Sequence, residues 1–171
     1  MFLALTFTGH MFEPWGKRDP RVDPEVKVVI SDDVKLYLEE VVIPLRLSCI
    51  TPSGWPVVLS LWYLYRDGQL YCATQNTAKV VGYLEREPRC AFEVASDLPP
   101  YCGVRGQARA AVDARLGAEI LEQLLVRYLG GTESPLAKRL LSDRDNEVAI
   151  AIQPVNIHSW NFADRMQSSI T

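Results

Sequence analysis

The chain has 171 residues, of which 48% are hydrophobic, and a formal net charge of −3. A chain of this length buries about 70% of the surface that it exposes when unfolded, so one domain needs neither a metal ion nor a disulfide for stability. The weak charge, the lack of long Lys/Arg runs and the lack of any apolar run of about 20 residues argue against nucleic acid and membrane as partners.

The first 24 residues are expected to form an irregular N-terminal arm, followed by a single domain over residues 25–171. The stretch "EPWGKRDPRVDPE" carries three prolines among charged residues, and proline interrupts regular elements. The opening "MFLALTFTGHMF" lacks the basic start and the small-residue cleavage site of a signal peptide. We therefore expect a cytoplasmic protein that starts at Met1 or at Met11.

Apolar spacing predicts three main helices. The first begins near Ser31, a candidate N-cap followed by acidic residues, and is limited by Pro44. A short helix is expected over residues 77–87 and is ended by Pro88. The clearest helix lies in "RLGAEILEQLLVRYLG", where apolar residues recur every three or four positions until Gly130.

Alternating and β-branched segments predict six strands, over residues 45–51, 55–65, 69–74, 89–96, 102–114 and 147–160. An Asp67-Gly68 turn joins the second strand to the third. The short connections favour antiparallel pairing, and closure of the sheet removes exposed edges. The sequence therefore predicts a mainly β fold with peripheral helices, in which a six-stranded antiparallel sheet forms a small barrel.

The cysteines and histidines give little support for metal or disulfide chemistry. No pair of cysteines has C-x-x-C spacing, and all four lie in strand-like segments, so we interpret them as reduced thiols of the core rather than as a disulfide or metal set. These residues are Cys49, Cys72, Cys90 and Cys102. His10 and His158 lie far apart in the sequence, so no metal ligand is predicted.

A polar cluster stands where "LYCATQNTAK" passes from a strand to a helix. Thr74 and Thr77 offer hydroxyl donors, and Lys79 adds a positive charge at the start of the helix. The first backbone N–H groups of a helix are unpaired within it and lie at its positive end, where a phosphate can bind. The alternative is that Thr77 only caps the helix and that Lys79 is a solvated surface residue.

The order of these signals resembles that of the FMN-binding split β-barrels, the pyridoxamine 5′-phosphate oxidase-like superfamily. The resemblance is carried by "GWPVVLSLWYLYRDGQLYCATQNTAKVVGYLEREP", then "PPYCGVRGQARA" and "VNIHSW", and covers about residues 32–164. It implies a six-stranded split barrel that forms a homodimer. It also implies FMN bound between the two subunits, and an oxidoreductase that transfers hydride to or from a small molecule.

The resemblance also implies roles for single residues. The FMN phosphate would be held by the loop after the third strand and by the following lysine, hence by Thr74, Thr77 and Lys79. The flavin ring would lie along the second strand, beside Val58, Leu59, Ser60 and Trp62. On that strand, alternation places Val58, Ser60 and Trp62 on one face.

Two aromatic residues are implied to close the site from the second subunit: Tyr101 and Trp160. Their alternative is ordinary packing in the barrel or in the dimer core. No catalytic residue is predicted, because hydride transfer by a bound flavin needs no acid–base pair from the chain.

The chain departs from the vitamin-processing oxidases of this superfamily. Their phosphate-binding arginine and their lysine on the second strand are replaced here by valine and by an aromatic residue, and their C-terminal Arg-Leu-x-Pro segment is absent. Oxidation of pyridoxamine phosphate is therefore not expected. Arg46 would add an anion contact if its side chain faced the site.

Three other functions stay open. A reductase that uses the deazaflavin coenzyme F420 would need basic residues for the longer anionic tail of that coenzyme, and only Arg86 and Arg89 lie near Lys79 in sequence. A non-enzymatic protein could bind flavin or haem, with His158 as the candidate axial ligand of haem. A barrel without a cofactor would be a dimeric scaffold.

Overall fold

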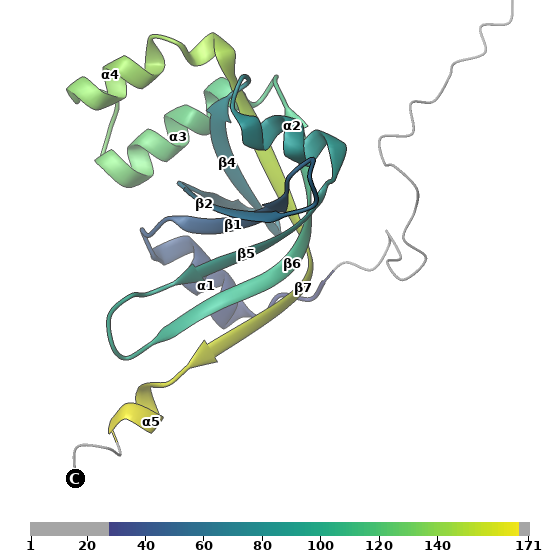
Figure 1. The fold of residues 1–171 in the computed structure, drawn as a ribbon. Coiled ribbons are helices and arrows are strands. Elements are labelled where there is room, and N and C mark those ends of the chain that lie inside the picture. Colours follow the sequence, from purple (N-terminus) through teal and green to yellow (C-terminus); the bar gives the residue numbers. More distant parts are fainter. Residues whose placement is uncertain (1–27, 168–171) are drawn as a thin grey trace, which may run out of the picture.

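Seven strands form one antiparallel sheet that curls around the main apolar core (Figure 1). This computed structural model describes residues 28–167, and the expected arm at 1–24 lies outside them, with His10 and Met11. The strands are β1 (Leu45–Ile50), β2 (Pro56–Leu61), β3 (Leu64–Arg66), β4 (Gln69–Gln75), β5 (Arg89–Ala95), β6 (Cys102–Asp113) and β7 (Glu147–Asn161). Their order in the sheet is β2-β1-β5-β6-β7-β4-β3.

The helices lie around the sheet, as the prediction of a β fold with peripheral helices requires (Figure 1). They are α1 (Asp32–Glu40), α2 (Lys79–Arg86), α3 (Gly117–Leu129), α4 (Pro135–Leu141) and α5 (Ala163–Gln167), with a 3-10 turn η1 (Arg144–Asn146). α2 packs against β1 and β6, α3 packs against β4 and β7, and α4 packs on α3. The three main predicted helices are confirmed as α1, α2 and α3.

Residues 55–65, expected as one strand, divide at Trp62-Tyr63 into β2 and β3. β2 pairs with β1 whereas β3 pairs with β4, so the chain passes here from one edge of the sheet to the other. Tyr63 is completely buried at this break, and its backbone N–H donates to the Tyr128 hydroxyl at 3.2 Å. That side chain replaces the acceptor that a neighbouring strand would provide, so the buried N–H of Tyr63 is not left unpaired. The division accounts for seven strands in place of the predicted six.

Arg127 of α3 ties this break to the end of α1. Its guanidinium donates to the backbone carbonyls of Glu39 at 2.6 Å and of Leu38 at 3.1 Å. These carbonyls have no partner within α1, and a cation beside them also interacts favourably with the helix dipole. The same guanidinium lies 5.3 Å from the centre of the Tyr63 ring. One side chain therefore joins α1, α3 and the strand break.

The four cysteines are free, as the sequence predicted. Three of them are buried, and burial raises the pKa of the Cys90 thiol to about 12. Within residues 28–167, no group of three or more His, Cys, Asp or Glu side chains could hold a metal ion. No helix in the same range is long and apolar enough to cross a membrane.

The strand break can be tested with Tyr63→Phe. The Tyr63 hydroxyl donates to the Leu38 carbonyl at 2.9 Å, and loss of this buried bond should lower the free energy of unfolding in urea by about 1 kcal/mol. Tyr65→Phe is the matched control, because no hydrogen bond of its hydroxyl is found among the described residues. Equal stability of the two variants would contradict a role for the Tyr63 hydroxyl.

Candidate functional site

The polar cluster forms a tight turn between β4 and α2. The backbone N–H of Ala78 donates to the carbonyl of Gln75 at 2.9 Å and closes the turn. Ala78, not Thr77, is the N-cap of α2, and no side chain caps that helix end. Thr77 therefore does not act as the helix cap that the alternative interpretation required, and its exposed hydroxyl makes no hydrogen bond to the described chain.

A cavity of about 520 Å³ opens beside this turn. Its lining includes Asn76, Thr77 and Lys79, together with Glu85 of α2 and Val148 of β7. The Lys79 side chain is exposed, and no carboxylate in residues 28–167 forms an ion pair with it. The structure thus brings Thr77 and Lys79 together at the start of α2.

Thr74 lies on β4 just before the turn, opposite Val148. It is not part of the cavity lining. The hydroxyl and cation that face the cavity therefore come from the turn and from α2, and an anion is the ligand that suits them.

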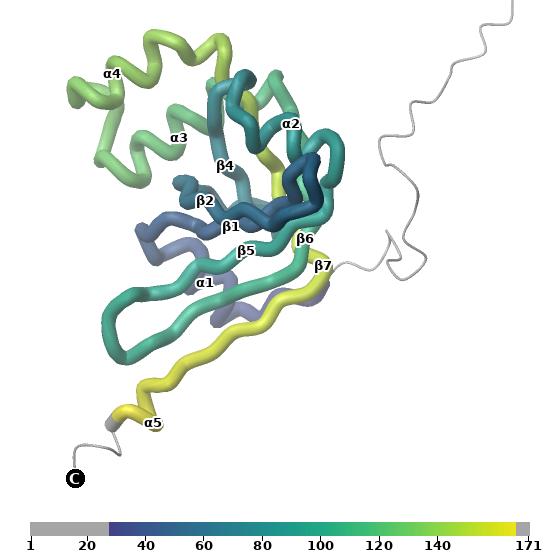
Figure 2. The backbone as a smooth tube through the Cα atoms, in the orientation of Figure 1, coloured from purple at the N-terminus to yellow at the C-terminus, as the bar shows by residue number. Residues whose placement is uncertain are grey.

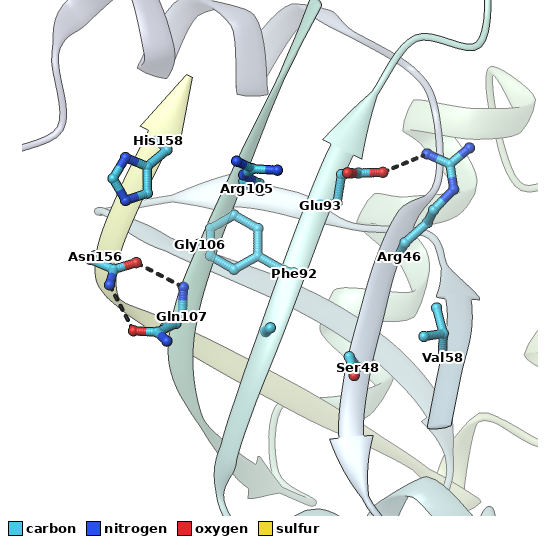
Figure 3. A pocket seen from close by; sticks show the side chains of 11 residues that line it. Arg46, Ser48, Val58, Phe92, Glu93, Arg105, Gly106, Gln107, Asn156 and His158 are labelled. Carbon is cyan, nitrogen blue, oxygen red and sulfur yellow. Dashed lines mark hydrogen bonds and ion pairs between the residues drawn. The ribbon is translucent and has the colours of Figure 1, made fainter. Parts of the chain in front are cut away.

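A second cavity, of about 460 Å³, lies on the outward face of five strands (Figure 3). Strand register aligns outward side chains in two cross-strand rows. The first row is Ser60, Arg46, Glu93, Arg105 and His158. The second row is Val58, Ser48, Ala91, Gln107 and Asn156. The hollow lies over the short side chains of Ser48 and Ala91 in the second row. The longer charged side chains of the first row stand beside it.

Arg46 belongs to this outward face, which answers the question left open by the sequence (Figure 3). Its guanidinium forms ion pairs with Glu93 at 3.4 Å and with Asp97 at 2.6 Å. Gln107 and Asn156 bond to each other, with the Asn156 side-chain amide donating to Gln107 Oε1 at 2.7 Å. The alternation in "CGVRGQARA" was the signal that could have placed Arg105 and Gln107 on one face.

The residues expected beside the flavin ring separate along β2. Val58 and Ser60 are exposed on the outward face, whereas Leu59 packs against the core. Trp62 lies beyond the end of β2, and its ring stacks on Tyr128 of α3 with centres 4.9 Å apart. The strand break thus removes Trp62 from the face of Val58 and Ser60, contrary to the expected alternation.

Trp160 pairs with Gly103 at the start of β6, and Tyr101 directly precedes this strand. The start of β6 lies at the opposite end of the strand from α2 (Figure 2). The Trp160 ring covers Gly103, where an added Cβ would stand 2.6 Å from it, so this position needs glycine. The Arg105 guanidinium lies 5.5 Å from the centre of the same ring. Tyr101 is 44% exposed and is held through its carbonyl, which accepts from the N–H of Phe162 at 3.0 Å.

Val112, near the opposite end of β6, lines the cavity at α2. One chain therefore does not bring Tyr101 and Trp160 to Lys79. Their predicted role as cofactor neighbours requires a second copy of the chain.

Solved structures of several proteins share this fold. Conserved hypothetical protein Rv2991 from Mycobacterium tuberculosis matches with a TM-score of 0.65 and 20% identity, over 82% of this chain and 90% of its own. An F420 reductase matches with a TM-score of 0.64 and 18% identity, over 75% of this chain and 98% of its own. A candidate pyridoxamine 5′-phosphate oxidase from Listeria innocua matches with a TM-score of 0.57 and 19% identity, over 74% of this chain and 95% of its own.

The fold is that of the pyridoxamine 5′-phosphate oxidase-like split barrels. The same fold is found in a haem storage protein from Vibrio cholerae, at 15% identity and a TM-score of 0.55 over 74% of this chain and 89% of its own. It is also found in an FAD-binding protein from Mesorhizobium loti, at 19% identity and a TM-score of 0.55 over 76% of this chain and 94% of its own. No protein-family model and no curated protein matches the chain.

In this split barrel, Arg86 on α2 and Arg89 just after it are engaged by the protein itself. Arg86 donates to the backbone carbonyl of Thr51 at 2.6 Å and so holds the turn between β1 and β2. Arg89 grips Glu87 through two guanidinium nitrogens, at 2.8 and 2.7 Å. These hydrogen bonds lower the pKa of Glu87 to about 2. Both cations thus have protein partners and are less available to an external anion than Lys79.

The Glu87–Arg89 pair predicts a pH-dependent stability. A carboxyl group whose pKa is lower in the folded state stabilises that state above its unfolded pKa, here about 4.5, and loses the effect as the pH falls toward 2. Glu87→Gln should therefore lower the free energy of unfolding by up to about 1 kcal/mol at pH 6, because the pair is partly exposed. Urea titrations should show that this difference shrinks below pH 4.5.

Glu85→Gln on the same helix is the matched control, since no ion pair of Glu85 is found in the described part of the chain. Glu85→Gln should leave the free energy of unfolding unchanged both at pH 6 and below pH 4.5. A Glu87→Gln effect that does not depend on pH would contradict the ion-pair explanation.

Proposed function

We propose that this split barrel binds FMN at a homodimer interface and transfers hydride to or from a small molecule. The observation that carries the proposal is the cavity at the start of α2, where Lys79 has no carboxylate partner among residues 28–167 and stands beside the Thr77 hydroxyl. Structural neighbours that include an FAD-binding protein and an F420 reductase support a flavin-type cofactor.

The phosphate of FMN suits this turn on physical grounds. A phosphate monoester carries nearly two negative charges and several acceptor oxygens. In this proposal it accepts hydrogen bonds from Thr77, from Lys79 and from the first N–H groups of α2, with Thr74 next to the turn. Each bond to a charged group contributes about 1.5–3 kcal/mol, so three or four such bonds are enough for micromolar binding after the cost of association.

The flavin ring, in this proposal, lies along β2. This strand is at one edge of the sheet, so one side of its backbone has no neighbouring strand. Unpaired N–H and C=O groups of an edge can bond to the donors and acceptors of a planar heterocycle. Contacts through the backbone include Leu59, although its side chain points into the core, and Ser60 adds a hydroxyl. Trp62 lies beyond the strand end and would reach only that end of the ring.

The second subunit, in this proposal, supplies Tyr101 and Trp160. The outward face of β1, β2, β5, β6 and β7 is the proposed dimer surface, because it carries a hollow and alternating charges that a second copy can match. An obligate pair of this kind buries on the order of 2,000 Å² or more. The bound flavin supplies the hydride chemistry, and the chain binds it, orients it and shields it from water.

FMN is preferred over the deazaflavin coenzyme because of the charges near α2. Arg86 and Arg89, the basic residues nearest Lys79 in sequence, are already bonded to Thr51 and Glu87. They therefore add little for the longer anionic tail of the deazaflavin coenzyme. The similarity to an F420 reductase keeps that coenzyme as the second candidate.

The visible absorption spectrum of the purified protein is the first experiment. A two-banded flavin spectrum that stays with the protein through gel filtration would support the proposal. A Soret band would favour haem and direct attention to His158, which is exposed on the outward face. A colourless protein that does not bind added FMN would contradict the proposal.

The phosphate site predicts the effect of Lys79→Ala. Loss of a direct charged contact should weaken FMN binding by about 1.5–3 kcal/mol, that is about ten- to a hundredfold, as measured by quenching of flavin fluorescence. Lys138→Ala on α4 is the control, because that lysine pairs with Glu133 away from the cavity. Unchanged affinity in Lys79→Ala would show that Lys79 is an ordinary surface residue.

The proposed interface predicts the effect of Val58→Asp. Val58 is 65% exposed on the outward face, and a buried aspartate at an interface would be costly, so this variant should sediment as a monomer at micromolar concentration. Val126→Asp is the matched control, since Val126 is 57% exposed on α3, and it should leave the dimer intact. A wild-type protein that sediments as a monomer would contradict both the dimer and the shared site.

A further inference from the structure

The described chain buries one polar or charged side chain, that of Glu147 at the start of β7, which is 6% exposed. Burial and the nearby Asp143 raise the pKa of this carboxyl, and no cation among the described residues pairs with it. A buried carboxyl group is costly unless it is hydrogen-bonded. The hydrogen bond that Glu147 accepts therefore offsets part of the cost of its burial.

The donor of that hydrogen bond is a residue of the polar turn between β4 and α2. The side-chain amide of Gln75 donates to Glu147 Oε1 at 2.6 Å. Gln75 is the residue whose backbone carbonyl accepts from Ala78 and closes the turn. The next residue, Asn76, donates from its N–H to the carbonyl of Asn146 at 2.8 Å, directly before Glu147. Asn146 and Glu147 thus hold the turn through one backbone bond and one side-chain bond, beside the strand pairing of Gln75 with Glu147.

The backbone of Glu147 is itself fixed by α3. A Cβ on Gly117, the first residue of α3, would stand 1.9 Å from the Glu147 carbonyl oxygen, so only glycine allows this contact. Glu147 therefore joins a fixed position on the scaffold to a turn whose exposed residues face the cavity.

We propose that Glu147 is the positioning residue of the anion site at α2. Through Gln75 it fixes the turn so that the Thr77 hydroxyl and the start of α2 face a phosphate together. Glu147 itself does not touch the ligand, because it does not line the cavity. This inference rests on the proposed function, since it assumes that the turn binds the FMN phosphate.

A purely structural role for Glu147 predicts something different. Loss of a buried bond that only stabilises the barrel would weaken the binding of any ligand through partial unfolding. Loss of a positioning bond would weaken only ligands that carry the phosphate. Riboflavin, which has the flavin ring but no phosphate, separates the two cases.

The experiment compares FMN and riboflavin affinity, by fluorescence titration, in wild type, Glu147→Ala and Glu147→Gln. Glu147→Ala should weaken FMN binding about tenfold and leave riboflavin binding unchanged. Glu147→Gln should restore FMN binding, because its side-chain oxygen still accepts from Gln75. A double variant with Lys79→Ala should bind FMN no more weakly than the product of the two single effects, because both act on one phosphate.

If Glu147→Ala does not fold, Gln75→Ala removes the same bond from its half-buried side and should give the same FMN-specific loss. Equal weakening of FMN and riboflavin, or a Glu147→Gln variant as weak as Glu147→Ala, would overturn the inference. A Lys79→Ala variant with normal FMN affinity would overturn the proposed phosphate site itself. Normal FMN affinity in Glu147→Ala beside a weakened Lys79→Ala would overturn only the role of Glu147.

Discussion

The hydrogen bond from the Tyr63 backbone to the Tyr128 hydroxyl is the contact on which the break between β2 and β3 depends. A strand that left its sheet in the core would ordinarily leave a costly unpaired N–H group. Here a side chain of α3 accepts that bond, and its own hydroxyl donates to the Ile43 carbonyl at 2.9 Å. The chain can therefore turn from β2 into β3 within two residues. Both edges of the sheet come from this one continuous segment.

The division matters for the proposed function because it leaves β2 at an edge of the sheet, beside the proposed dimer surface. The two groups of predicted site residues then lie apart. Thr77 and Lys79 stand at the cavity of α2, whereas Trp160 lies near the other end of β6. A dimer resolves this separation in the proposed function, since each site would take its phosphate contacts from one copy and its aromatic cover from the other.

Much of this architecture was predictable from local patterns. The helix over 117–129 follows from its apolar spacing, and the polar turn before α2 follows from hydroxyl and amide residues between a strand and a helix. The break at Trp62-Tyr63 was not predictable, because the apolar and aromatic pattern continues through it. At this break the Tyr63 N–H donates to Tyr128, which is distant in sequence.

The two outward rows were also beyond sequence reasoning. They depend on the register of five strands, and the register of β6 and β7 shifts between Gln107 and Ala108. A one-residue change in pairing would move these side chains to the other face. Glu147 was missed for a related reason, since glutamate at a strand start is usually solvated, and its burial depends on the tertiary fold.

The reactivity of the buried thiols would report local opening of the barrel. Cys72 lies on β4, whereas Cys49 and Cys90 lie on β1 and β5, which belong to the other half of the strand order. An alkylating reagent reacts with the thiolate and needs access to the sulfur, so each of these residues must wait for its own strands to separate. The ratio of their modification rates would compare how often the two halves of the barrel open locally. A cofactor that binds across the halves would slow both rates together.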